Sequence, residues 1–274
     1  MSSSLTRLWV VATPLGNPGD LSPRAREILT SVDFILAEDT RRSGLLLATC
    51  SIKAKKLISF HDHNEEKRLR AVLAELRAGK VAALISDAGT PLISDPGFTL
   101  VRACREEGLK VSPVPGPSAP VAALSASGIA PLPYAFLGFP PRKQHELESF
   151  FFPFANLALT LIFFERKDRL ADSLAAARLI LGPRNACIAR ELTKTYEEFI
   201  FFTLGEELPE FLGEITVIVG PPQDVRTPLP EVLALARTLR EGDEKPRETA
   251  RRLQAKVRGW TSKELYALLT EPAS

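Results

Sequence analysis

Short runs of mostly apolar residues alternate with amphipathic segments along the first part of the chain. The runs at residues 8–12, 33–37, 57–60, 81–85 and 110–114 are bounded by turn-forming residues, which is typical of buried strands. Helical spacing predicts helices at 65–78 and 98–107, and Ser22-Pro23 provides an N-cap and a first-turn proline for another. Because the strands are apolar throughout, the pattern predicts a parallel sheet covered by helices on both faces.

A second set of apolar runs follows at residues 159–164, 185–189, 198–202 and 214–219, with a helix predicted at 170–181. The remaining pattern predicts three short helices at 230–240, 246–257 and 262–269. We therefore expect an α/β lobe at residues 1–117, a second α/β lobe at 118–222 and a small helical domain at 223–274.

Composition changes this picture in two places. Proline makes up 22 of the 274 residues, and ten of these prolines fall between residues 86 and 143. Rigid loops are therefore concentrated there. The net charge is only +2, but seven Lys and Arg residues against one Glu occur between residues 245 and 263. A local basic patch suits nucleic-acid phosphates, so the small domain is a candidate RNA-binding element.

The cysteines and the hydropathy of the chain indicate the cellular compartment in which the protein is expected. The three cysteines are far apart and form no C-x-x-C motif, which disfavours disulfides and a cysteine zinc site and favours a reducing compartment. The most apolar run, residues 150–164, contains Pro153 and Asn156 and is too short to span a bilayer. Residues 1–8 lack the pattern of a signal peptide. We expect a cytoplasmic protein that does not bind membranes.

The strongest candidate for chemistry is the segment 86–97, SDAGTPLISDPG, which joins a predicted strand to a helix. Ligands of open α/β sheets bind beyond the carboxyl ends of the strands. Gly89 permits close approach of the backbone to a ligand, and Asp87 can accept a hydrogen bond from a ribose hydroxyl or pair with a cation. The alternative is a capped turn in which Asp87 or Asp95 accepts from backbone amides.

Two further strand–loop–helix junctions, ATPLG at 12–16 and VPGPS at 114–118, are expected to line the same crevice. Ser118 and the amides after it can hold an anionic group, or Ser118 can serve as a simple N-cap. None of the three junctions has a G-x-G-x-x-G or Walker pattern, which disfavours dinucleotide and P-loop sites.

Charged clusters follow two other predicted strands. The segment AEDTRR at 37–42 places Glu38, Asp39 and Arg41 where the sheet meets solvent. The segment HDHNE at 61–65 could bind a metal, but an obvious third ligand is lacking, so we expect none. A catalytic or substrate-binding polar loop is preferred there, and simple helix capping by Asn64 is the alternative. The segment ARELTK at 189–194 is either functional or a solvated turn.

Through these stretches the sequence resembles the 16S rRNA (cytidine-2′-O)-ribose methyltransferase I family of the tetrapyrrole-methylase-like superfamily. The matching stretches, in family order, are VATPLGNPGDLSPRA, AEDTRRSGLLL, HDHNE, ISDAGTPLISDPG, VPGPSA, FLGFPPRK, ARELTKT and GEITVIVG. The combination of AEDTR, HDHNE and SDAGTPLISDPG is specific, because the related small-molecule methylases lack the first two.

The resemblance implies an α/β fold with a parallel-sheet N-terminal lobe, a mixed-sheet second lobe and a small helical C-terminal domain. It implies a homodimer that holds S-adenosyl-L-methionine between its lobes. The implied activity is 2′-O-methylation of a cytidine ribose in the decoding region of 16S rRNA, in the small ribosomal subunit.

Matched by position, the resemblance also implies site residues. Those expected to hold the cofactor are Pro14, Asp87, Gly89, Thr90, Pro91, Ser118, Ala119, Phe164 and Leu192. The polar loops on the RNA side supply Glu38, Asp39, Thr40, Arg41, His61, Asp62, His63 and Asn64. Basic residues expected to contact RNA are Lys194, Arg247, Arg251, Arg252, Lys256 and Arg258.

The sequence departs from the family pattern in two places. Arg166-Lys-Asp-Arg169 stands where the family has a serine-proline-histidine type of stretch, and Val219-Gly220 stands where it commonly has Glu-Gly. Both departures fall in the second lobe.

The chemistry itself requires little covalent help, because the sulfonium methyl is already activated and in-line positioning does most of the work. A ribose hydroxyl is a weak nucleophile, so a base would help, and the candidates are Glu38, Asp39 and His61. Arg41 or Lys194 could stabilise the developing alkoxide. Two other hypotheses are a tetrapyrrole-precursor methyltransferase and a non-catalytic ribosome-assembly factor that binds RNA.

Overall fold

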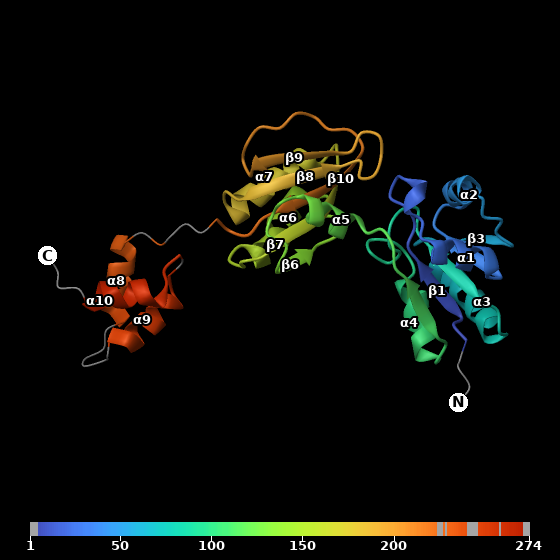
Figure 1. Cartoon of the computed structure of the whole chain (residues 1–274), viewed down its shortest axis with the longest axis horizontal. Helices are drawn as coiled ribbons and strands as arrows, with labels where there is room; N and C mark the ends of the chain where they lie inside the picture. Colours follow the sequence, from blue (N-terminus) through green and yellow to red (C-terminus); the bar gives the residue numbers. More distant parts are fainter. Residues whose placement is uncertain (1–4, 224–226, 228, 240–245, 258, 271–274) are drawn as a thin grey trace. The chain divides into compact units, whose positions relative to one another are not determined.

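The computed structural model describes residues 5–223, 227, 229–239, 246–257 and 259–270 (Figure 1). The chain divides into two compact units, Met1–Pro221 and Pro222–Ser274. The first unit holds two five-stranded sheets, and the second holds helices. The predicted α/β class is confirmed by this arrangement.

The first sheet has the order β3-β2-β4-β1-β5, and every strand pair in it is parallel. Its strands are β1 (Leu8–Val11), β2 (Phe34–Ala37), β3 (Leu57–Ser59), β4 (Ala82–Ile85) and β5 (Val111–Val114). All five were predicted from their apolar runs. Because the strands are parallel, their carboxyl ends meet at one edge, where the loops after β1, β4 and β5 lie together.

Helices cover both faces of this sheet, as the unbroken apolar strands predict. Along β2, Phe34 and Leu36 pack on the side of α3 (Glu65–Arg77) and α4 (Phe98–Glu106). Ile35 and Ala37 pack on the opposite side, against α1 (Pro23–Ser31) and α2 (Thr40–Thr49). The side chain of Ser22 accepts from the amide of Ala25 at the start of α1, which confirms the predicted cap.

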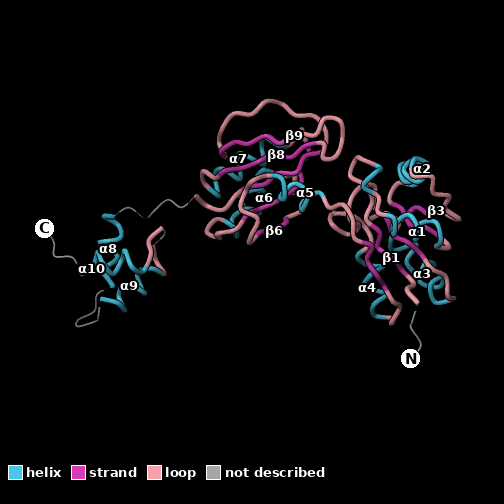
Figure 2. The backbone as a smooth tube through the Cα atoms, in the orientation of Figure 1, coloured by secondary structure: helices cyan, strands magenta, loops and turns pink. Residues whose placement is uncertain are grey.

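The second sheet is mixed and has the order β6-β7-β10-β8-β9. Its strands are β6 (Tyr134–Phe136), β7 (Thr160–Arg166), β8 (Asn185–Arg190), β9 (Glu198–Thr203) and β10 (Glu214–Val219). Among the described strand pairs of this second sheet, only β6–β7 is parallel, and β10 pairs antiparallel with both of its neighbours. Figure 2 shows the long irregular connection that leads from β9 into β10.

Three helices pack against this sheet. Side chains of α6 (Gln144–Phe151) and α7 (Leu170–Leu181) lie in the core on one face, and α5 (Ala119–Ala126) packs on the other. Leu15, from the loop after β1, also packs in the core beneath α5. That contact joins the two lobes of the first unit at the edge where the strand-end loops gather.

The second unit contains α8 (Leu229–Leu239), α9 (Pro246–Gln254) and α10 (Ser262–Thr270). Val232, Leu253 and Leu265, one from each helix, are fully buried in its apolar core. Along the described residues, no helix combines the length and apolar character needed to cross a bilayer.

Three elements are absent from the sequence prediction: α2, β6 and α6. The α2 segment, TRRSGLLLAT, begins with polar residues and contains Gly44, which weaken its helical signal. Asp39, which precedes it, is nevertheless a good N-cap, and its carboxylate accepts from the amide of Arg41 at 2.8 Å.

Ser118 occupies the N-cap position of α5, but its side chain makes no capping hydrogen bond.

Candidate active site

The three predicted strand-end loops of the first sheet are joined by hydrogen bonds. The amide of Thr13 donates to the carbonyl of Gly89 at 2.8 Å, and the amide of Gly89 donates back to Thr13 at 3.0 Å. The hydroxyl of Thr90 donates to the carbonyl of Pro117 at 2.9 Å. The loops after β1, β4 and β5 therefore form one connected surface.

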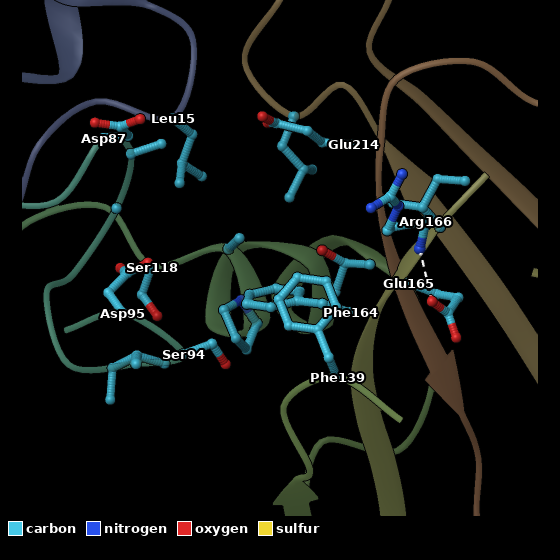
Figure 3. A pocket seen from close by; sticks show the side chains of 18 of the residues that line it. Leu15, Asp87, Ser94, Asp95, Ser118, Phe139, Phe164, Glu165, Arg166 and Glu214 are labelled. Carbon is cyan, nitrogen blue, oxygen red and sulfur yellow. Dashed lines mark hydrogen bonds between the residues drawn. The ribbon is translucent and has the colours of Figure 1, made fainter. Parts of the chain in front are cut away.

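This surface forms one wall of a cavity of about 650 Å³ (Figure 3), a size ordinary for a cofactor site. The second lobe supplies the opposite wall, with Phe139, Phe164 and Glu214 among its residues. From the first lobe and α5, the lining residues are Leu15, Glu38, Arg42, Asp87, Ala88, Gly89, Thr90, Ile93, Ser94, Asp95, Ser118, Ala119 and Pro120. The second lobe adds Phe139, Phe164, Glu165, Arg166, Lys167, Asp168, Leu192, Gly213, Glu214, Ile215 and Thr216.

Seven of the nine residues that the resemblance assigns to the cofactor line this cavity. They are Asp87, Gly89, Thr90, Ser118, Ala119, Phe164 and Leu192. The other two, Pro14 and Pro91, are buried behind the wall, where they adjoin Thr13 and Thr90 and so fix the shape of the loops.

Gly89 brings the backbone close to the cavity. Its φ is +79°, and a Cβ atom there would lie 3.1 Å from Cδ2 of Leu15 and 3.8 Å from the carbonyl oxygen of Pro117. A larger residue would be strained and would fill space beside the lining side chains, so the position favours glycine.

Asp87 is engaged on both of its carboxylate oxygens. Oδ1 accepts from the backbone amide of Asp39 at 3.2 Å, and Oδ2 pairs with Nη1 of Arg42 at 3.0 Å. The SDAGTP and AEDTRR segments are thus held together by this one side chain. Arg42 was absent from the sequence prediction, although it follows Arg41 in a segment already selected.

Some side chains of the AEDTRR segment line the cavity, and others lie on the surface. Glu38 lines the cavity, and burial raises the pKa of its carboxyl group, with Asp87 and Asp62 adding to that rise. Asp39 caps α2 instead, and its hydrogen bonds with Arg41 lower its pKa to about 2. The Arg41 side chain is 90% exposed, and Thr40 is the first residue of α2. Of the predicted catalytic residues, Glu38 is therefore the one in the cavity wall.

The HDHNE segment is a loop held by its own hydrogen bonds. The Oδ1 atom of Asn64 accepts from the amide of His61 at 3.0 Å, and its Nδ2 lies 3.0 Å from Nε2 of the His61 ring. Asp62 and His63 are exposed. His61 and Asp62 act electrostatically on Glu38, so this loop adjoins the cavity without lining it. Within the described residues, no three metal-ligating side chains gather as an ion site.

Lys194 is held by two carboxylates. Its Nζ lies 3.1 Å from Oε1 of Glu191 and 3.0 Å from Oε2 of Glu214. The same loop contacts the first lobe, because the hydroxyl of Thr193 accepts from the amide of Asn17 at 3.0 Å. Lys194 thus joins the loop after β8 to the start of β10, beside the cavity wall.

Asp95, which the sequence analysis names only in the alternative of a capped turn, also lines the cavity. Burial, followed by the charges of Glu38, Asp87 and Asp62, raises its pKa to about 7. The second SD dipeptide of SDAGTPLISDPG was the signal that could have singled it out.

One of the two departures from the family pattern lies in the cavity wall. Arg166, Lys167 and Asp168, which replace the expected stretch after Glu165, all line the wall of the second lobe. Arg166 pairs with Asp168 at 3.2 Å. Val219, the other departure, is fully buried at the end of β10.

Four of the basic residues expected to contact RNA lie on or just after α9. Arg247, Arg251, Arg252 and Lys256 are exposed, while Thr249, Ala250 and Leu253 face the core. Arg258 lies outside the described residues. The exposed side of this short helix therefore carries several positive charges.

A family profile and the similar curated proteins both relate this chain to methyltransferases. The profile of the tetrapyrrole (corrin/porphyrin) methylases matches residues 7–208. Over 277 aligned residues the chain is 40% identical to the ribosomal RNA small subunit methyltransferase I of Escherichia coli O157:H7, and the match covers 98% of this chain and 96% of that protein.

Solved structures share the fold at lower identity. The methyltransferase CobJ superposes with a TM-score of 0.62 at 19% identity, covering 82% of this chain and 97% of its own. A uroporphyrin-III C-methyltransferase from Thermus thermophilus, complexed with S-adenyl homocysteine, gives a TM-score of 0.53 at 22% identity, covering 78% and 97%. At these identities the similarity establishes the fold, with its two different sheets.

Proposed function

We propose that this chain, which belongs to the ribosomal RNA small subunit methyltransferase I family, transfers a methyl group from S-adenosyl-L-methionine to ribosomal RNA of the small subunit. The observation that carries the proposal is 40% identity to a member of that family across nearly the whole of both chains. The cavity supports it with a site at the strand ends of an α/β sheet, where ligands of such folds bind.

The residues of the cavity suit S-adenosyl-L-methionine. The cofactor supplies a methyl group that is already activated on a positively charged sulfur. Carboxylates favour that positive charge, and the ring of Phe164 and the side chain of Leu192 offer apolar surface to the adenine. On the other wall, Gly89 and Thr90 present backbone close to the ligand. One structural neighbour is complexed with S-adenyl homocysteine, which supports the same cofactor.

We infer further that the methyl acceptor is the 2′-hydroxyl of a cytidine ribose in the decoding region of 16S rRNA. This choice follows from the match to AEDTR and HDHNE. Glu38 of the first segment lines the cavity, and the second segment adjoins it. Glu38 and Arg42 lie in the wall there, on the side where the acceptor ribose is expected.

The remaining parts of the proposal concern partners. We propose that the chain acts as a cytoplasmic homodimer on the small ribosomal subunit, and that residues 223–274 form an RNA-binding domain. The exposed arginines and lysine of α9 support the last point, because each phosphate contact releases a counterion from the RNA.

Transfer of a radioactive methyl group to small subunits lacking the modification tests the activity. Methylation of the 2′-oxygen removes the nucleophile of alkaline cleavage, so one decoding-site cytidine should become resistant to alkali. Free 16S rRNA as the acceptor tells whether an assembled subunit is required. Transfer to a porphyrinoid but not to RNA would favour a tetrapyrrole-precursor methyltransferase. RNA binding without cofactor affinity by calorimetry would favour an assembly factor.

The RNA-binding domain has its own test. Replacing Arg247 and Arg251 with Ala should weaken RNA binding and reduce the slope of log affinity against log salt by about one per lost phosphate contact. Cofactor affinity should remain unchanged. An unaltered salt slope would refute the assignment of α9 to RNA.

A further inference from the structure

Six carboxylates line the cavity, and four of them are neutralised by a neighbouring cation. The pairs are Asp87 with Arg42 at 3.0 Å, Glu165 with Arg169 at 3.4 Å, Asp168 with Arg166 at 3.2 Å and Glu214 with Lys194 at 3.0 Å. Across the described part of the chain, no cation forms an ion pair with Glu38 or Asp95. These two carboxylates are therefore the ones in the wall whose basicity is not reduced by a paired cation.

The loop that carries Asp95 is held in an unusual conformation. Leu92 and Ser94, neither of them glycine, both have a φ of +72°, a region that costs on the order of 1–3 kcal/mol for such residues. Gly97 follows with a φ of +120°, and a Cβ atom there would lie 2.5 Å from Cδ2 of Leu84 in the sheet. Backbone strain of this kind persists where the surrounding structure fixes a side chain in a required position.

The charges around Asp95 come from several elements. Glu38 directly follows β2, Asp87 lies in the loop after β4, and Asp62 lies in the loop after β3; all three carboxylates oppose ionisation of Asp95. A hydrogen bond from Ser86 acts in the opposite direction. Arg42 and His61 favour ionisation of Glu38 instead. With its pKa raised to about 7, Asp95 both accepts and releases a proton near neutral pH, where a general base is most effective.

We propose that Asp95 is the catalytic residue that accepts the proton of the ribose hydroxyl, and that Glu38 is a positioning residue that acts through Asp95. The inference rests on the proposed function. The ribose oxygen forms a bond to the methyl carbon as the carbon–sulfur bond breaks, and the electron pair of that bond stays on sulfur as a neutral thioether. The hydroxyl proton moves to the carboxylate of Asp95, so atoms and charge balance without another reactant.

The structure argues against the other two bases considered from the sequence. Asp39 is committed to the N-terminus of α2 and to Arg41, and its pKa of about 2 makes it a weak proton acceptor. His61 adjoins the cavity but does not line it. Glu38 does line it, so the experiment must separate Glu38 from Asp95.

The test compares Asp95→Asn and Glu38→Gln in single-turnover methyl transfer to small subunits at saturating cofactor, between about pH 5.5 and 9. The wild-type rate should rise with pH and level off above about pH 7, because Asp95 must be ionised to accept the proton. Asp95→Asn should lower the plateau by roughly 100-fold or more. Glu38→Gln should keep most of the plateau and move its midpoint to lower pH, because one opposing charge is removed.

Matched controls are Asp172→Asn and Glu148→Gln, which lie on the exposed faces of α7 and α6 and should leave rate and midpoint unchanged. Cofactor affinity of Asp95→Asn should stay within about twofold of wild type, which shows that the variant folds. A wild-type rate and midpoint in Asp95→Asn would overturn the inference. So would loss of the plateau in Glu38→Gln with Asp95→Asn still active. If the wild-type chain methylates no rRNA, the proposed function itself fails, whatever the variants do.

Discussion

The two walls of the cavity are built from different kinds of structure. The wall from the first lobe consists of strand-end loops, in which Gly89, Leu92 and Ser94 all have positive φ angles. The wall from the second lobe comes largely from strands, with Phe164 to Arg166 on β7 and Glu214 to Thr216 on β10. Loops can be bent to present backbone and carboxylates at chosen points, whereas a sheet supplies a stable surface with side chains on alternating sides.

The side chains of the two walls differ in the same way. The carboxylates of the second lobe in the wall, Glu165, Asp168 and Glu214, are all paired with cations. Phe164 packs between Phe136 and Phe139, with ring centroids 4.9 and 5.3 Å away. We therefore propose that both walls position the cofactor and that the first wall accepts the proton. Changes in the first wall should therefore have the larger effects.

The largest effect is expected for Gly89→Val. The new side chain must accept a left-handed φ and would extend toward Leu15, so cofactor affinity should fall by on the order of 100-fold. Calorimetry with S-adenosyl-L-methionine measures this. Gly108→Val is the matched control, because Gly108 also has a positive φ of +71° but meets nothing within 4 Å. Equal losses in both variants would show that strain alone, and not the cavity wall, is responsible.

A smaller loss, roughly 10- to 30-fold in cofactor affinity, is expected for Asp87→Ala. Asp87 holds both the amide of Asp39 and the guanidinium of Arg42, so its removal loosens the AEDTRR segment at the cavity. Arg42→Gln separates the two roles of Asp87, because it removes the ion pair with Arg42 and leaves Asp87 able to contact the cofactor. If Asp87→Ala leaves cofactor affinity unchanged, the cofactor lies elsewhere. If Arg42→Gln reproduces the full loss, Asp87 acts only by holding Arg42.

Gly89 and Asp87 could be selected from the sequence alone, because the signal that marks them lies in the neighbouring residues. Gly89 and Asp87 lie at a strand end, and strand ends are visible as the limits of apolar runs. The parallel sheet, four of the five strands of the second sheet and the helix at Leu170–Leu181 were predictable for the same reason. The segment Thr40–Thr49 was not, because its helix depends on burial of Ser43 and Leu47 against the sheet.

The role of Asp95 was also beyond the sequence. Its aspartate stands in a turn-forming stretch, and a turn is an adequate explanation of Ser-Asp-Pro-Gly taken alone. What distinguishes Asp95 is the charge of Glu38, which follows β2 and stands 57 residues earlier in the chain. The same limit applies to Arg166, Lys167 and Asp168, since only the fold places them in the wall.

On the second wall, Phe164→Ala should weaken cofactor binding by about 10-fold, which corresponds to loss of one aromatic contact and its apolar area. The substitution also removes the contacts of Phe164 with Phe136 and Phe139, so a modest fall in thermal stability is expected. Phe201→Ala, at a side chain that is 61% exposed on the same sheet, is the control. A loss as large as that of Gly89→Val would remove the difference between the walls.

The smallest effect is on stability and concerns Asp95→Asn. In the folded chain the pKa of Asp95 is about 7, above its ordinary value of 3.8, so ionisation of this group opposes folding. The group contributes stability that is complete below about pH 4 and is lost as pH rises through 7. Asparagine cannot ionise, so the variant should equal wild type near pH 4 and exceed it at pH 8. The gain should be about 1–2 kcal/mol, since Asp95 is only half-buried and solvent screens its charge.

Urea unfolding at the two pH values measures this difference, with Asp172→Asn as a control that should show none. A variant that is more stable than wild type above pH 7 yet slow in methyl transfer would mean that the first wall holds Asp95 for chemistry at the expense of stability. Equal stability at both pH values would mean that Asp95 ionises as freely as an exposed carboxylate. The carboxylate of Asp95 would then ionise as readily as those of the second wall, and the contrast between the walls would be one of backbone shape alone.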